Sequence, residues 1–381
     1  MTGTRVLLLT IDYAPQTGGQ PRLVSSIVES TADLVAWRVV TAAPATSTEV
    51  GTDFTAQHVV RTSGFAGIAR EAWRLRSWLT NSDDRLIVSG HVYLGWLAHL
   101  LGVLTRTRVS TLCYGRELVP AKLNQRLALL SLRRDHRVVT ISSHSEHLLH
   151  RLGVSPEVTS WIGCELTPPA AFVSSEPSSR GNAIRLVAIS RLAEGYKNLE
   201  IIMRATAVLV ANGTVEHLTI VGEGPRRSAL QHRIDQLGIQ QHVTLAGHIA
   251  NQELATVIAE SDIGLFPSRD APAEGGFEGF GIVVHELAAA GLPVVVGDAA
   301  GARDAADPAW ATLIDPDDLR AWVAAIADLA SNVELRQQRS LAAAEFGTRL
   351  DTSRTARTYL AALTGDGSIA PRTVDPDLAE I

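Results

Sequence analysis

The stretch Ile184-Arg-Leu-Val-Ala-Ile189 is a short, largely apolar run, and the loop Ser190-Arg191-Leu-Ala-Glu-Gly-Tyr-Lys197-Asn198 follows it before a pattern with helical spacing begins. A run of β-branched residues and leucine without polar alternation is typical of a strand that is buried on both faces of a sheet. A strand that leads through a loop into a helix is the first half of a β-α-β unit. The stretch therefore predicts a parallel sheet.

Runs of the same kind recur along the chain, each followed by helical spacing. They are Val6–Ile11, Leu86–Ser89, Val109–Cys113, Val138–Ile141, Leu218–Val221, Ile263–Phe266 and Pro293–Val296. Alternating strands and helices predict an α/β fold with right-handed crossovers.

A stretch rich in proline and serine, residues 167–182, has no periodicity and reads as a linker. We therefore expect two doubly wound, Rossmann-like domains at residues 1–166 and 183–346. A last helix is expected within residues 347–363, and a flexible tail at residues 364–381.

Composition narrows the class of protein. The 381 residues are 46% hydrophobic and 19% charged, which is typical of a globular chain, and the net charge of -6 argues against nucleic acid as the main ligand. No apolar run is long enough to span a bilayer, and the run near the start is too short for a secretory signal. With only two cysteines, a reducing compartment is favoured, so we expect a cytoplasmic protein.

Basic residues are unevenly distributed. The first 170 residues contain 17 basic and 13 acidic side chains, and the remainder contains 17 and 27. The front half is thus the better candidate for a phosphorylated or membrane-surface partner, although such an excess is usually a solvated face. Only Lys122 and Lys197 are lysines, so an ammonium group in particular is expected to be needed where they occur.

The loops at strand ends contain the candidate chemistry, because doubly wound sheets bind ligands there. Arg191 and Lys197 would bring two cations to one site, as a bound diphosphate requires. Gly18 and Gly19 precede a helix, and their backbone amides could approach an anion. Glu278 lies in a glycine-rich loop. Glu286 lies about five residues into the helix that follows, about 7–8 Å along the helix axis. A glutamate in a buried helix needs a partner, which the hydroxyls of a ribose would provide.

The motifs that contain these residues resemble those of the retaining glycosyltransferases of family 4. That family has the two-domain GT-B fold, with a cleft between facing domains. The resemblance rests on Glu278-Gly-Phe-Gly-Ile-Val-Val-His-Glu286, Arg191 with Lys197, Val221-Gly-Glu-Gly-Pro225, Leu237–Gly247 and Ala259-Glu-Ser-Asp262. In the front half, Tyr13–Gly19 and Ile141–Gly153 resemble the mannosyltransferase-like branch of that family.

The resemblance implies roles for individual residues. Arg191, Lys197 and Glu278 would be catalytic: the two cations would stabilise the leaving nucleoside diphosphate, and Glu278 would sit beside the hexose. The positions that would bind the sugar donor are Gly18, Gly19, Gly222, His248, Ile249, Gly279, Phe280, Gly281, Ile282 and Glu286. No metal and no cofactor are expected, since the nucleotide-sugar is a substrate. The front domain would bind the acceptor, and the last helix would pack back on it.

The chain departs from the family pattern after the run Val109–Cys113. The family often has His-Gly-x-Glu or His-Gly-x-Asp there, and this chain has Tyr114-Gly115-Arg116-Glu117. Either Tyr114 or His91 is expected to take the place of that histidine near the acceptor, together with Glu117. The family's Gly-Gly-Glu after the Pro293 strand also appears here as Ala300-Gly301 with Asp304.

The leading hypothesis is transfer of a hexosyl unit from a GDP- or UDP-sugar to a hydroxyl of a small molecule, glycan or lipid, with no nucleic-acid partner. One alternative is a phosphoinositide-type lipid glycosyltransferase in peripheral contact with the inner face of the membrane. Another is a nucleotide-sugar-binding relative without catalysis. A nicotinamide enzyme is disfavoured, because Arg227 stands where the third glycine of the dinucleotide fingerprint belongs.

Overall fold

The computed structural model describes residues 4–14, 16, 18–42, 58–119, 123–156, 158–159, 183–271 and 276–369. The chain divides into two compact units. One comprises Met1–Gly163 together with Asp351–Ile381, and the other comprises Cys164–Leu350. The expected linker at residues 167–182 and most of the expected tail lie outside the described residues.

The first unit is built on a seven-stranded parallel sheet with strand order β3-β2-β1-β4-β5-β6-β7. The strands are β1 (Arg5–Thr10), β2 (Ala36–Thr41), β3 (His58–Arg61), β4 (Arg85–Ser89), β5 (Arg108–Cys113), β6 (Arg137–Thr140) and β7 (Val158–Thr159). Its α-helices are α1 (Gly19–Ser30), α2 (Gly64–Arg74), α3 (Arg76–Thr80), α4 (Gly95–Thr105), α5 (Leu123–Ser131), α6 (Ser143–Arg151) and α13 (Thr352–Thr364).

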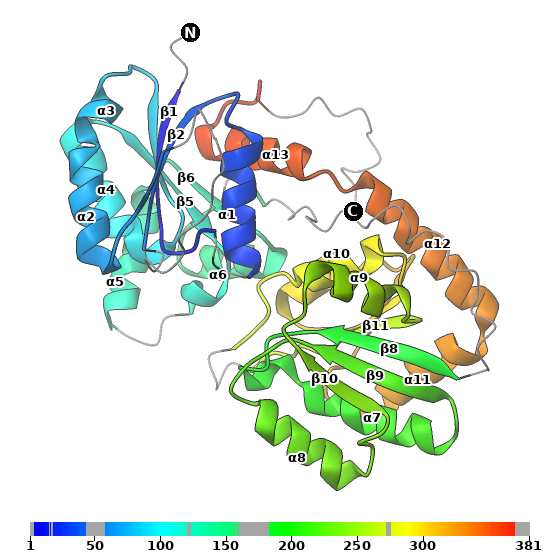
Figure 1. Ribbon diagram of the computed structural model, residues 1–381. Helices are drawn as coiled ribbons and strands as arrows, with labels where there is room; N and C mark the ends of the chain where they lie inside the picture. The colour runs from blue at the N-terminus through cyan, green and yellow to red at the C-terminus, as the bar shows by residue number, and fades with distance from the viewer. Residues whose placement is uncertain are drawn as a thin grey trace. The chain divides into compact units, whose positions relative to one another are not determined.

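Helices cover both faces of this sheet (Figure 1). On one face, Leu7 and Leu9 of β1 pack in a core with Ile68 of α2 and Leu97 of α4. On the other face α1 lies beside α13, and α13 also contacts β5 and β6. The buried Ser110 hydroxyl of β5 donates a hydrogen bond of 2.8 Å to the carbonyl of Leu363, which joins the last helix to the sheet.

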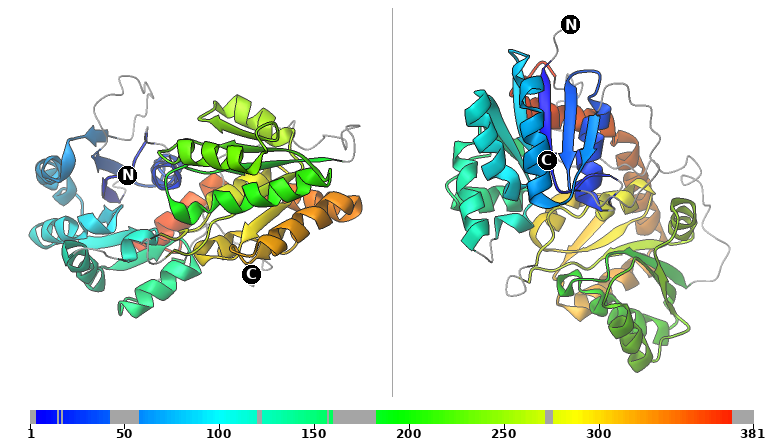
Figure 2. Two further views of the ribbon diagram at one scale, coloured as in Figure 1. Left: turned by 90° about the horizontal axis from the view of Figure 1, so that it is seen from below. Right: turned by 60° about the vertical axis from the view of Figure 1, so that its left-hand side comes forward.

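The second unit has a six-stranded parallel sheet with strand order β10-β9-β8-β11-β12-β13. The strands are β8 (Ile184–Ile189), β9 (Val215–Val221), β10 (Val243–Gly247), β11 (Ile263–Phe266), β12 (Val294–Gly297) and β13 (Ala311–Ile314). The α-helices are α7 (Leu199–Ala211), α8 (Arg227–Leu237), α9 (Asn251–Ala259), α10 (Ile282–Ala289), α11 (Leu319–Ser331) and α12 (Val333–Arg349). Helices α7, α8 and α11 share one core on one face, and α9 and α10 lie on the other (Figures 1 and 2).

Both sheets confirm the predicted doubly wound α/β class, since strand order reverses once in each. The reversal falls between β1 and β4 in the first sheet and between β8 and β11 in the second. In such sheets ligands bind outside the carboxyl ends of the strands, at the point of reversal. Among the helices that the structure describes, none is long and apolar enough to cross a membrane.

Candidate active site

Lys197 and Glu278 meet at the reversal point of the second sheet. Lys197 ends a short 3-10 turn after β8, and Glu278 lies in the loop after β11, 81 residues later. Their side chains form an ion pair with 2.5 Å between Nζ and Oε2. Parallel neighbouring strands bring these two loops to the same edge, so the fold itself accounts for the pairing.

The surroundings of this ion pair are mostly apolar. Only 12% of the Lys197 side chain and 15% of the Glu278 side chain are exposed. The Lys197 ammonium lies 5.1 Å from the ring centroid of Tyr196 and 5.8 Å from that of Phe266, both within reach of a cation–π contact. The Ser268 hydroxyl donates to the same Glu278 oxygen at 3.3 Å.

Two opposing effects act on the pKa of Lys197. Burial lowers the pKa, and the charge of Glu278 together with its hydrogen bond raises it. The net direction is upward, so Lys197 is an ammonium at neutral pH. A charged amine held in a partly dry position can stabilise an anion more strongly than the same amine in water.

Arg191 lies on the same loop as Lys197 but is not buried. Its side chain is 65% exposed and pairs with Glu194 at 3.2 Å. Its charge is nevertheless close enough to oppose the upward shift in the pKa of Lys197. Because exposed ion pairs are weak, the guanidinium can exchange Glu194 for a stronger anion at small cost.

Gly222, directly after β9, makes a close backbone contact with the loop after β8. A Cβ atom at Gly222 would lie 1.9 Å from the Ser190 carbonyl oxygen, and its φ of 138° favours glycine. Its amide donates to the Gly247 carbonyl at 2.9 Å. His248, which is exposed, and Ile249, which is half-buried, follow Gly247 at the end of β10. These residues line the same carboxyl edge as Lys197.

The amino end of α10 completes this edge. Gly281, with a φ of 91°, caps the helix that starts at Ile282, and Phe280 before it is buried. The Gly301 amide donates to the Glu278 carbonyl at 3.1 Å, and a Cβ at Gly301 would lie 2.0 Å from the Gly279 carbonyl. Glu286, on α10, is 4% exposed. Backbone amides at a helix start are suited to an anion.

In the first unit, Gly18 (φ 133°) precedes α1, and Gly19 is the first residue of that helix. His91 follows β4 at the reversal point and is buried. Its Nδ1 accepts a hydrogen bond from the Tyr93 amide at 3.2 Å. Burial lowers the pKa of His91 to about 4, so the imidazole is neutral at pH 7.

Tyr114 and Glu117 form a closed set of contacts after β5. Glu117 accepts from the Tyr114 amide at 2.5 Å, and the Tyr114 hydroxyl donates to the Gly90 carbonyl at 3.0 Å. Both side chains are buried, and burial raises the pKa of the Glu117 carboxyl, against the effect of backbone hydrogen bonds. These groups tie the loop after β5 to the loop after β4, which places Tyr114 and His91 on neighbouring loops.

Sequence reasoning did not find three neighbours of the Lys197–Glu278 pair: Tyr196, Phe266 and Ser268. Phe266 ends β11 and Ser268 comes two residues later, so their positions at a strand end were the available signal. Among the described residues, no group of three or more His, Cys, Asp or Glu side chains is arranged to hold a metal ion.

Part of the second unit matches a family of known proteins. Residues 183–332 match the family model described as Glycosyl transferases group 1. A GDP-mannose-dependent alpha-(1-6)-phosphatidylinositol monomannoside mannosyltransferase of Mycolicibacterium smegmatis is 32% identical over 166 residues, 43% of each chain. A glycogen synthase of Mycobacterium tuberculosis is 28% identical over 161 residues, 41% of this chain and 37% of that protein. The matches thus span less than half of these curated relatives.

Solved structures extend the likeness in fold to nearly the whole chain. The Anabaena protein HepE, crystallised with UDP and glucose, has a TM-score of 0.75 and 18% identity, covering 95% of this chain and 100% of that one. Each of the two units contributes one parallel α/β sheet, and two such sheets are typical of the GT-B fold. Residues 183–332 thus match the group 1 glycosyltransferases, and solved structures share the fold over nearly the whole chain.

Proposed function

We propose that this protein transfers a hexosyl unit from a nucleoside-diphosphate sugar to a hydroxyl acceptor, with retention at the anomeric carbon. The observation that carries the proposal is the Lys197–Glu278 pair at the reversal point of the second sheet, beside the start of α10. This arrangement brings a buried cation, a carboxylate and backbone amides to the carboxyl edge of the second sheet. A diphosphate joined to a sugar needs all three.

In this proposal the second unit binds the sugar donor. Lys197 and Arg191 hold the diphosphate, while Glu278 contacts hydroxyls of the hexose. Glu286 holds the ribose hydroxyls. The amides of Gly279, Phe280, Gly281 and Ile282 contact the β-phosphate and the sugar. Gly222, His248 and Ile249 contact the nucleoside. Gly18 and Gly19, the remaining positions proposed to bind the sugar donor, belong to the first unit.

The transfer step requires no protein side chain as a general base. The acceptor oxygen bonds to the anomeric carbon as the bond from that carbon to the β-phosphate oxygen breaks. The acceptor's proton passes to the departing phosphate on the same face. Negative charge grows on the diphosphate, and Lys197 and Arg191 stabilise it where it develops. We propose the first unit, with His91, Tyr114 and Glu117, as the acceptor side.

GDP-mannose is our first choice of sugar donor. The mycobacterial relative that is 32% identical over 166 residues is named for it. HepE was crystallised with UDP, but its 18% identity supports only the fold.

A thermal-shift screen with GDP, UDP, ADP and dTDP, followed by transfer assays with the matching sugars, tests this function. We expect GDP at about 100 times its dissociation constant to stabilise the protein by about 2.7 kcal/mol, with smaller effects from the other nucleotides. If GDP stabilises the protein, we also expect slow hydrolysis of GDP-mannose or transfer of its mannosyl unit. Stabilisation by a nucleotide without transfer or hydrolysis would instead identify a binding protein that has lost catalysis.

A lipid acceptor at the inner face of the membrane is the second candidate, because α4 exposes an apolar stripe. Trp96, Leu100 and Val103 are 51%, 53% and 76% exposed, and their spacing puts them on one side of the helix. The neighbouring α2 contains Arg70 and Arg74, whose side chains are about two-thirds exposed. Exposed aromatic and aliphatic side chains near arginines are typical of proteins that bind anionic membrane surfaces.

Sedimentation with vesicles of phosphatidylcholine and phosphatidylinositol tests this candidate. We expect the protein to sediment with these vesicles and a Trp96→Ser/Leu100→Ser/Val103→Ser variant to lose most of that binding. Leu341→Ser, which alters a 72% exposed leucine on α12 in the other unit, is the control and should not change sedimentation. Equal sedimentation of all three proteins would rule out α4 as the membrane-binding surface.

A further inference from the structure

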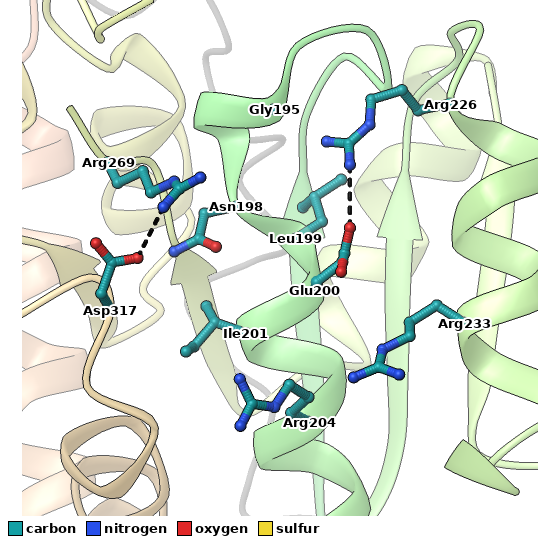
Figure 3. Close-up of a pocket in the computed structure, with 10 residues that line it drawn as sticks. All are labelled: Gly195, Asn198, Leu199, Glu200, Ile201, Arg204, Arg226, Arg233, Arg269 and Asp317. Carbon is teal, nitrogen blue, oxygen red and sulfur yellow. Dashed lines mark hydrogen bonds and ion pairs between the residues drawn. The ribbon is translucent and has the colours of Figure 1, made fainter. Parts of the chain in front are cut away.

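A cavity of about 550 Å3 opens beside the first turns of α7 in the second unit (Figure 3). It is lined by Gly195, Asn198, Leu199, Glu200, Ile201, Arg204, Arg226, Arg233, Arg269 and Asp317. None of these residues is among the positions proposed to bind the sugar donor. The cavity contains four arginines and two carboxylates, so its lining has an excess of positive charge.

Two of the arginines are paired with the two carboxylates. Arg226 bonds Glu200 at 3.0 Å, and Arg269 bonds Asp317 at 3.2 Å. Figure 3 shows these pairs on opposite sides of the amino end of α7. Each of these ion pairs is neutral overall, so the excess positive charge of the cavity comes from its two other arginines.

Arg204 of α7 and Arg233 of α8 lie at the same end of the cavity, away from Gly195 (Figure 3). Within the part of the chain that the structure describes, neither has a carboxylate within ion-pairing distance. The Arg233 Nε is buried without a hydrogen-bond partner there, and its Nη1 donates to Gln236 at 3.1 Å. Two like charges on one cavity wall, one with an unsatisfied buried N–H, disfavour the empty state and favour a bound anion.

We propose that this cavity is a second anion site, which binds a small molecule bearing a phosphate or diphosphate group. Guanidinium groups bind phosphate oxygens through paired hydrogen bonds, and Arg204 and Arg233 offer two such groups from adjacent helices. A volume of about 550 Å3 lies within the ordinary range for small-molecule sites and exceeds what one inorganic ion fills. The ligand is therefore a phosphorylated molecule with a body of its own.

The wall of the cavity is bonded to the loop that contains Lys197, so a test has to separate the two sites. Arg226 Nη1 donates to the Glu194 carbonyl at 3.4 Å, and the Arg269 amide donates to the Tyr196 carbonyl at 2.8 Å. A phosphate probe can also occupy the proposed sugar-donor site. Binding is therefore measured in a Lys197→Ala background, in which the sugar-donor site lacks its buried cation.

The experiment is calorimetric titration of Lys197→Ala with inorganic pyrophosphate and with glucose 6-phosphate, at constant ionic strength. We expect binding of both probes. Adding Arg204→Gln and Arg233→Gln to this background should weaken binding of both probes at least about tenfold, because two charged hydrogen-bond donors to the phosphate oxygens are lost. Adding Arg349→Gln, which removes one exposed charge from α12 outside the cavity, should leave the affinity unchanged.

Two results would overturn the proposal. One is that Lys197→Ala binds neither the two soluble probes nor vesicles with phosphatidylinositol phosphate, because the anion would then bind only at the sugar-donor site. The other is equal affinity with and without the Arg204 and Arg233 substitutions. The same variants are also tested for binding to vesicles that contain phosphatidylinositol phosphate. Binding that occurs only with vesicles, and is lost when Arg204 and Arg233 are substituted, would assign the phosphate to a lipid headgroup.

Discussion

Lys197→Ala is expected to lower the turnover number for sugar transfer by about two to three orders of magnitude. Removing one preorganised group that stabilises transition-state charge typically costs about 2.7–4 kcal/mol of activation free energy. Lys197 is such a group in the proposed mechanism, because its side chain is only 12% exposed and its ammonium contacts Glu278 and two aromatic rings. The measurement is steady-state transfer from the sugar donor that stabilises the wild-type protein.

Lys197→Met separates lost charge from lost packing. Methionine retains an apolar stem over Tyr196 and Phe266, whereas alanine leaves a gap. Both variants remove the cation that pairs with the buried Glu278 carboxylate and leave the Ser268 hydroxyl as its donor within the described residues, so each should unfold at lower temperature than wild type. If charge matters, both variants lose turnover similarly while thermal unfolding stays cooperative. Wild-type turnover in Lys197→Met would rule out the electrostatic role.

Arg349→Gln is the control for net charge in this experiment. It removes one positive charge from an exposed position on α12 and should leave turnover and unfolding temperature near wild type. A similar loss in this variant would point to long-range electrostatics and not to the position of Lys197.

Strands buried on both faces were predictable from sequence because they read as continuous apolar runs. Every run named from the sequence coincides with a strand to within a few residues. Five strands were not predicted: β2, β3, β7, β10 and β13. Of these, β10 and β13 lie at the two edges of the second sheet. Buried residues alternate with exposed or partly exposed ones in β10, and only Ala311 is buried in β13. The continuous apolar pattern does not apply to strands with one covered face.

Strand order limits what the sequence could predict about the site. Lys197 and Glu278 were each singled out from their loops, but their contact depends on β8 and β11 being neighbours. Two strands, β9 and β10, come between them in the chain, so spacing alone cannot place them side by side. Once the order is known, the pairing follows from the rule that ligand sites occur where strand order reverses.

The cavity beside α7 was hidden from the sequence for a related reason. Arg204 and Arg233 lie on different helices and have no motif in common, and arginine is frequent in this chain. Only the packing of α7 beside α8 brings the two guanidinium groups to one cavity.

Gly222→Ala is expected to destabilise the protein by about 2–4 kcal/mol and to weaken binding of the sugar donor. Its φ of 138° is a conformation that L residues rarely adopt, which costs about 1–3 kcal/mol. The new methyl carbon would also lie 1.9 Å from the Ser190 carbonyl oxygen. Backbone cannot yield as a flexible side chain does, so the loop that leads to Arg191 has to move. Urea unfolding and titration with the preferred nucleotide measure the two effects.

Gly213→Ala isolates the contribution of the contact with Ser190. Gly213 also has a positive φ, 75°, but a Cβ there meets nothing within 4 Å. We expect it to cost only about 1–2 kcal/mol of stability, from the left-handed backbone, and to leave nucleotide affinity unchanged. If Gly222→Ala were no worse than Gly213→Ala in both measurements, the loop after β8 would not depend on this contact. A larger loss of both stability and affinity at Gly222 would show that close backbone packing at the reversal point positions the loop that contains the two proposed diphosphate ligands.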